Sequence, residues 1–178
     1  MLFRSASWFI SNSYQAQMPA YAQDIGHADP GLTYSLLLAA DALGALCAGL
    51  LWESIGPRSP ATPRKAMGYA CIWAVSMALF ALTSHYAFAI VLLFVAGFAE
   101  LTSNSTAQTI VQTSAPLPIR GRVIGLFNMS ALGLRFGSGL MVGVLGGWMG
   151  IHGSLVVACA CFLCFLGLLQ LKFKDQLS

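Results

Sequence analysis

Six long apolar stretches divide the 178-residue sequence and limit what it can fold into. A helix needs roughly 20 apolar residues to cross the hydrocarbon core of a bilayer. Only 8% of the residues are charged, against roughly 25% in a soluble domain. We therefore predict an all-α membrane protein in which residues 1–178 form a single transmembrane domain. Its six helices are expected at residues 2–22, 32–52, 66–84, 87–112, 123–149 and 154–171.

Prolines mark two of the predicted loops. Residues 53–65 and 114–122 together hold five of the seven prolines in the chain. Proline has no backbone N–H and interrupts the interior of a helix, so it is tolerated mainly outside helices. We therefore expect both segments to be loops.

The lysines and arginines indicate how the helices lie in the membrane. Eight of the nine basic residues fall on one side of the predicted bundle, and the ninth, Arg135, falls within 123–149. Basic loop residues are retained on the cytoplasmic side of a membrane. The sequence thus predicts a multi-pass protein of the plasma (inner) membrane with both termini in the cytoplasm. The eight residues are Arg4, Arg58, Arg64, Lys65, Arg120, Arg122, Lys172 and Lys174.

The six predicted helices form two consecutive triplets with the same order of helix types. In each triplet a polar helix comes first, a helix with small residues and one charge comes second, and an apolar helix comes third. Three spans reverse the direction of the chain, so a doubled triplet is a 3+3 inverted repeat, an arrangement common in transporters. The equivalent pairs are 2–22 with 87–112, 32–52 with 123–149, and 66–84 with 154–171.

Each class of helix has an expected environment. A polar helix cannot face lipid, so 2–22 and 87–112 should line a wet cavity. Small residues let helices approach closely, so 32–52 and 123–149 should pack tightly, and the two apolar helices should face lipid. In 87–112, polar side chains from Glu100 to Gln112 recur every four residues and form one stripe. The predicted substrate-cavity residues are Asn12, Gln15, Gln17, Glu100, Asn104 and Gln108.

Three charges lie near the middle of their predicted helices: Asp41, Glu100 and Arg135. Each would cost roughly 2.5–3.5 kcal/mol at the bilayer centre, which suggests that they compensate one another. Arg135 can neutralise one carboxylate, and the other carboxyl can then carry a proton through a conformational change. Asn128, one heptad before Arg135, extends this predicted coupling network. A buried ion pair or triad that only fixes helix register is an equal alternative.

Catalytic and metal-binding patterns are missing from the sequence. Cys161 and Cys164 form a CxxC, but they lie in an apolar run and are interpreted as packing residues. The three histidines show no metal-ligand spacing, and no nucleophile–base set occurs together. We predict no enzyme activity, no cofactor and no metal. Without a basic patch interleaved with aromatics, nucleic acid is not an expected partner either.

The loop after 32–52 resembles the loop signature of the major facilitator superfamily. That signature has a glycine, three residues, an acid, a basic residue, any residue, a glycine and two basic residues. Ser54 and Pro57 depart from it, as in the second copy of the motif, which follows the eighth helix of the family. The matching residues are Gly49, Glu53, Gly56 and Arg58, with Glu53 in place of the usual aspartate.

Two further stretches resemble one subgroup of the family. Residues 116–123, PLPIRGRV, are similar to the start of the eleventh helix in drug- and siderophore-exporting members, and residues 19–21 are similar to the end of their seventh. The resemblance implies helices seven to twelve, the C-terminal half of a major facilitator fold. In the family, the first helix of each triplet lines the cavity, the second lines the interface between halves and the third faces lipid.

The resemblance also implies a function. The chain would be a secondary transporter that exports a small amphipathic molecule, such as a drug or siderophore, with protons as the coupling ion. Family members usually have twelve helices, so the expected partners are a substrate, the lipid bilayer, and a second six-helix half or another copy of the chain. The alternative is a membrane-embedded interaction or structural subunit, or an inactive transporter fragment.

Overall fold

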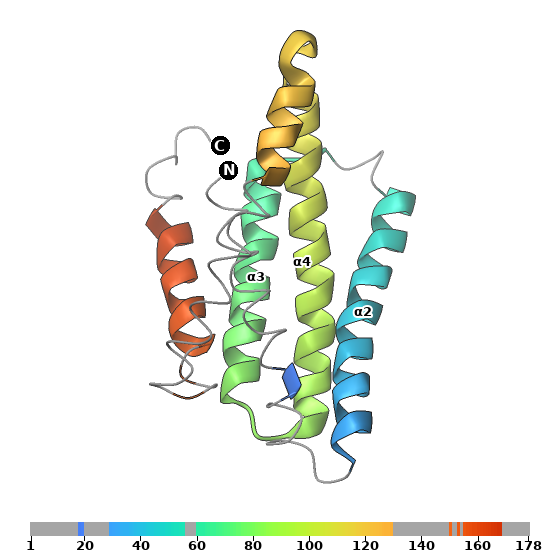
Figure 1. Ribbon diagram of the computed structural model, residues 1–178, viewed down its shortest axis with the longest axis vertical. Coiled ribbons are helices and arrows are strands. Elements are labelled where there is room, and N and C mark those ends of the chain that lie inside the picture. The colour runs from blue at the N-terminus through green and yellow to red at the C-terminus, as the bar shows by residue number, and fades with distance from the viewer. Residues whose placement is uncertain are drawn as a thin grey trace.

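The computed structural model describes residues 18–19, 29–55, 60–129, 150, 153 and 155–168. Three long helices lie within them: α2 (Pro30–Ile55), α3 (Pro63–Leu82) and α4 (Tyr86–Ser114). A short 3₁₀ helix, η2 (Leu117–Ile119), leads into a helix over 120–129, and a further helix spans Leu155–Leu168. The described ordered structure is thus all helical (Figure 1).

Helices α2, α3 and α4 are each long and apolar enough to cross a membrane, and Leu155–Leu168 is a shorter apolar helix. The prediction of a multi-pass, all-helical membrane protein is confirmed at this level. Residues 2–17 and 130–149 fall outside the described part of the chain, so the six-helix, 3+3 count stays a prediction.

The centre of the described bundle is α4, which packs against α2 on one side and α3 on the other (Figure 1). On the far side of α3 lies Leu155–Leu168. Trp73 of α3 meets Phe162 edge to face, with ring centroids 5.7 Å apart. Fully buried side chains, including Met77, Phe80 and Leu93, fill the core on both sides of α3 and at the α3–α4 contact.

Local capping decides where α2 and α3 begin and end. Asp29 Oδ1 accepts the N–H of Gly31 at 3.0 Å, so α2 starts two residues before the predicted 32–52. It also continues to Ile55, which places Glu53 in the helix and not in the predicted loop. Thr62 Oγ1 accepts the N–H of Lys65, and Pro63 supplies a helical φ at the first position, so α3 starts ahead of the predicted 66–84.

The predicted loop at 114–122 is wrong in its second half. After α4 ends at Ser114, residues 117–119 form η2 and a helix begins at residue 120. Arg120 and Arg122 therefore lie in the first turn of a helix. The physical reason is that Pro118 sits at the start of η2, where its fixed φ favours helical geometry and its missing N–H costs nothing.

The structure gives the packing partners of two helices. The apolar segment 66–84 is predicted to face lipid. In the structure α3 packs against α4 and Leu155–Leu168, and its exposed side chains Ile72, Val75 and Leu79 are apolar, so lipid contact on that side stays a prediction. An apolar helix carries no sequence signal for which side packs. The segments 32–52 and 123–149 are predicted to pack tightly. The structure places α2 against α4, and residues 130–149 lie outside its description.

Candidate functional site

One face of α4 carries hydroxyl groups that hydrogen-bond to both neighbouring helices. Thr102 is buried, donates to the Phe98 carbonyl at 2.8 Å, and accepts the indole N–H of Trp52 on α2 at 3.1 Å. Ser103 is also buried and donates to the Ala66 carbonyl on α3 at 2.9 Å. These polar side chains therefore join helices and do not line the predicted cavity.

The predicted polar stripe lies on a different face of α4. Glu100, Asn104 and Gln108 are half-buried, and Gln112 is exposed. At about 100° per residue, the stripe covers about 120° of the helix surface and does not overlap the face of Thr102 and Ser103. Its carboxyl and amide groups can donate and accept hydrogen bonds along about three turns of the helix.

Glu100 holds the central position of this stripe within the span. It is the middle residue of α4, with residues 86–99 before it and 101–114 after it. If α4 crosses the bilayer symmetrically, its carboxyl group lies near the midplane, where an ionisable group is costly and marks a functional site by default.

Asp41 lies where α2 and α4 meet most closely. A Cβ atom added at Gly97 would overlap the Asp41 carbonyl and would lie 2.8 Å from its carboxyl oxygen. A Cβ atom added at Gly44 would overlap the Phe94 carbonyl. The two backbones thus touch at both glycines. The Asp41 carboxyl group lies beside Gly97, about one helical turn before Glu100 along α4.

Gly97 was missed at the level of sequence. We noted Gly44 among the small residues of 32–52, but 87–112 was classified by its polar side chains alone. The available signal was the small-residue cluster Ala96, Gly97 and Ala99, all of which are buried. Small residues at such spacing let a second helix approach closely.

Several residues that we predicted as functional lie away from the Asp41–Glu100 region. Glu53 and Asn128 are exposed, and Gly49 is exposed beside Leu101, whose Cδ2 would lie 3.7 Å from an added Cβ. The predicted network of Asp41, Glu100, Asn128 and Arg135 is therefore described for its first three members only. The predicted residues outside the described part of the chain are Asn12, Gln15, Gln17, Gly56, Arg58 and Arg135.

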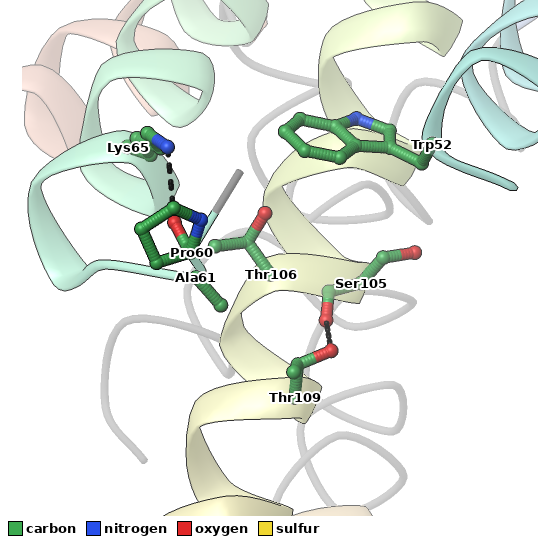
Figure 2. Close-up of a pocket in the computed structure, with 7 residues that line it drawn as sticks. All are labelled: Trp52, Pro60, Ala61, Lys65, Ser105, Thr106 and Thr109. Atoms are coloured by element: carbon green, nitrogen blue, oxygen red, sulfur yellow. Dashed lines mark hydrogen bonds between the residues drawn. The ribbon is translucent and has the colours of Figure 1, made fainter. Parts of the chain in front are cut away.

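A cavity of about 300 Å³ lies elsewhere, where α2 ends and α3 begins (Figure 2). It contains none of the predicted substrate residues. The sequence signals that could have found it were a tryptophan at the end of an apolar helix and a basic residue after a proline-rich loop. It is lined by Trp52, Pro60, Ala61, Lys65, Ser105, Thr106 and Thr109.

Among the described residues, no group of three histidine, cysteine, aspartate or glutamate side chains is placed to hold a metal ion. The described site therefore consists of a polar stripe and two carboxyl groups in membrane-spanning helices. Such an arrangement can bind a solute and exchange protons with it or with water.

Comparison with known proteins gives the family. The sequence matches the model of the Major Facilitator Superfamily over residues 1–138, a range that includes α2, α3, α4 and the helix at 120–129. The chain belongs to the major facilitator superfamily. Because members of this superfamily are membrane transporters, the match supports a membrane transport protein. No curated protein and no solved structure matches it.

Proposed function

We propose that this superfamily member is one six-helix half of a secondary transporter that exports a small amphipathic molecule, a drug or siderophore, in exchange for protons. The chain would correspond to the C-terminal half of the fold. It would lie in the plasma membrane with both termini in the cytoplasm, as the distribution of basic residues predicts.

The observation that carries the proposal is the position of two carboxyl groups at the α2–α4 crossing. Asp41 is packed beside Gly97, and Glu100 follows Gly97 by about 4.5 Å along α4 and about 60° around its axis. Acids retained inside membrane helices mark ion pathways and proton relays. In this proposal Glu100 or Asp41 takes up and releases the proton, while Arg135 neutralises the other and Asn128 extends the network.

The substrate would contact the polar stripe. Asn104 and Gln108 share the face of Glu100 and supply amide donors and acceptors for the polar part of an amphipathic molecule. Asn12, Gln15 and Gln17, from the equivalent helix of the first triplet, would complete the cavity wall. A second six-helix half, or another copy of this chain, would close the cavity on its other side.

Transport by the purified chain in proteoliposomes tests this function directly. Ethidium, an amphipathic cation, is the probe, and its movement is followed by fluorescence after a pH gradient is imposed. We expect the wild-type protein to move ethidium faster than protein-free liposomes, and an ionophore that abolishes the gradient to remove the difference. Asp41→Asn and Glu100→Gln test the carrier, and at least one should lower the rate to that of protein-free liposomes.

Asp29→Asn is the matched control, because Asp29 is an exposed acid at the start of α2 and asparagine can cap the helix in the same way. It should transport like the wild type. If Asp41→Asn and Glu100→Gln both retain full gradient-driven transport, neither is the carrier. If the wild-type protein moves nothing, alone or with a second half, the alternative of an interaction subunit or inactive fragment holds.

A further inference from the structure

We infer that the cavity between the end of α2, the start of α3 and α4 binds a phosphate group that carries hydroxyls, as in a glycerol phosphate headgroup. Its volume of about 300 Å³ is at the lower end of the range of small-molecule pockets, about 300–1,000 Å³, which suits a headgroup better than a whole lipid. This site is separate from the proposed transport pathway.

The side chains that line the cavity carry a single charge, and it is positive. Lys65 is the single charged residue among the seven that line the cavity. Its Nζ donates to the Pro60 carbonyl at 3.0 Å, and this bond holds the ammonium group at the rim (Figure 2). A fixed ammonium group beside an open cavity attracts an anion, and lysine is a standard ligand for phosphate.

The opposite wall offers hydrogen-bond acceptors. Thr106 donates its hydroxyl hydrogen to the Thr102 carbonyl at 2.7 Å, and Thr109 donates its own to the Ser105 carbonyl at 2.9 Å. Both hydroxyl oxygens therefore keep lone pairs for an incoming donor. A phosphate ester with free hydroxyls matches the cation on one wall and the acceptors on the other.

The cavity also lies at the depth expected of a lipid headgroup. Trp52, which lines it, meets Tyr69 edge to face at 6.4 Å, and tryptophan and tyrosine gather at the interface between a membrane and water. Basic pockets between transmembrane helices at this level accept anionic headgroups. The last turns of α2 expose Leu50 and Leu51, apolar surface of the kind that acyl chains cover.

The cavity and the predicted substrate stripe are on different sides of α4. Thr109 follows Glu100 by nine residues, which places it about half a turn around the axis. Neither Glu100, Asn104 nor Gln108 lines the cavity. Loss of headgroup binding and loss of transport can therefore be measured independently.

Native mass spectrometry of the detergent-solubilised full chain tests the inference. The protein is titrated with phosphatidylglycerol and with phosphatidylcholine, which has the phosphate but no free hydroxyl and no net charge. We expect a preference for phosphatidylglycerol. Lys65→Gln should lower that preference by about fivefold, the factor that corresponds to one basic side chain near an anionic lipid surface. Ala61→Phe, a change in the exposed loop, should block the cavity without removing charge.

Arg64→Gln is the matched control, because it removes the same charge from the neighbouring exposed residue, which does not line the cavity. It should change the preference little. Soluble glycerol 3-phosphate distinguishes a lipid headgroup from a free phosphate ester. If it binds the protein and the protein does not prefer phosphatidylglycerol to phosphatidylcholine, the ligand is a free phosphate ester. If the preference for phosphatidylglycerol persists in excess glycerol 3-phosphate, the ligand is a lipid. An unchanged preference in both Lys65→Gln and Ala61→Phe, or an equal loss in Arg64→Gln, would overturn the inference.

Discussion

Two glycines bring α2 and α4 into backbone contact. Gly44 faces the Phe94 carbonyl, and Gly97 faces the Asp41 carbonyl, so each helix offers a glycine to a carbonyl group of the other. No side chain fits at either position without separating the helices. In a membrane, where the hydrophobic effect does not hold helices together, such close contact is a main source of stability.

We predict that Gly97→Ala destabilises the protein by about 1–3 kcal/mol, the usual cost of overpacking a closely packed contact. The readout is the midpoint of thermal unfolding in detergent. Gly68→Ala in α3 is the control, because nothing lies within 4 Å of the added Cβ and alanine favours the helix. Equal midpoints for the two variants would show that α2 and α4 are not in backbone contact at Gly97.

At the scale of elements, α4 carries two sets of polar side chains at different positions around its axis. One face bonds to α2 through Trp52 and to α3 through Ala66, and the other carries the stripe of Glu100, Asn104 and Gln108. The mostly apolar helices α2 and α3 are thus each hydrogen-bonded to one side of α4. The proposed function assigns the stripe to a solute.

We predict that Ser103→Ala weakens the α3–α4 contact, because it removes the hydrogen bond to the Ala66 carbonyl. The cost should be about 0.6 kcal/mol, the average for such bonds between membrane helices. Ser35→Ala is the control, since Ser35 is exposed and donates to Gly31 within its own helix. Stability is measured by unfolding in detergent, and hydrogen exchange at the start of α3 should rise in Ser103→Ala alone.

At the scale of the whole molecule, the two ends of α4 define the two sides of the membrane that the chain is predicted to span. Ser84 precedes this helix and Leu117 follows it, and both residues are exposed. The basic residues Arg64, Lys65, Arg120 and Arg122 all lie at the end of the bundle where α4 terminates. The bias of basic residues predicts that this end is cytoplasmic.

Cysteine labelling in intact cells checks this orientation. In a background with the native cysteines replaced by alanine, Ser84→Cys should react with a membrane-impermeant maleimide, because its loop faces the outside. Leu117→Cys should react only after the membrane is permeabilised. The reverse pattern would invert the predicted topology.

Assembly is the second prediction at this scale. If two copies of this chain form the proposed transporter, native mass spectrometry from mild detergent should give a complex of twice 18.9 kDa. Co-purification of two differently tagged copies gives an independent measurement. A monomer at every concentration, with no tagged partner recovered, would argue against self-assembly and leave a distinct second half as the partner.

Sequence reasoning located α2, α3 and α4 to within a few residues, because hydropathy is a local property of the chain. It also identified the stripe on α4, since a four-residue spacing defines a helix face by itself. It failed at 120–122, where two prolines suggested a loop, but Pro118 is the second residue of η2 and a helix follows it. It did not indicate which side of α3 packs against α4, because apolar side chains lie all around that helix.

The sequence by itself determined that this chain has apolar helices long enough to span a membrane, that 87–112 carries a polar stripe, and the family to which the chain belongs. Only the tertiary structure decided that Gly97 meets Asp41, that Ser103 and Thr102 attach neighbouring helices, and that Lys65 shares a cavity with Thr109. The physical reason is that solvent preference and periodicity are written into short stretches of chain. Contacts between helices depend on which faces meet, and residues distant in sequence settle that together.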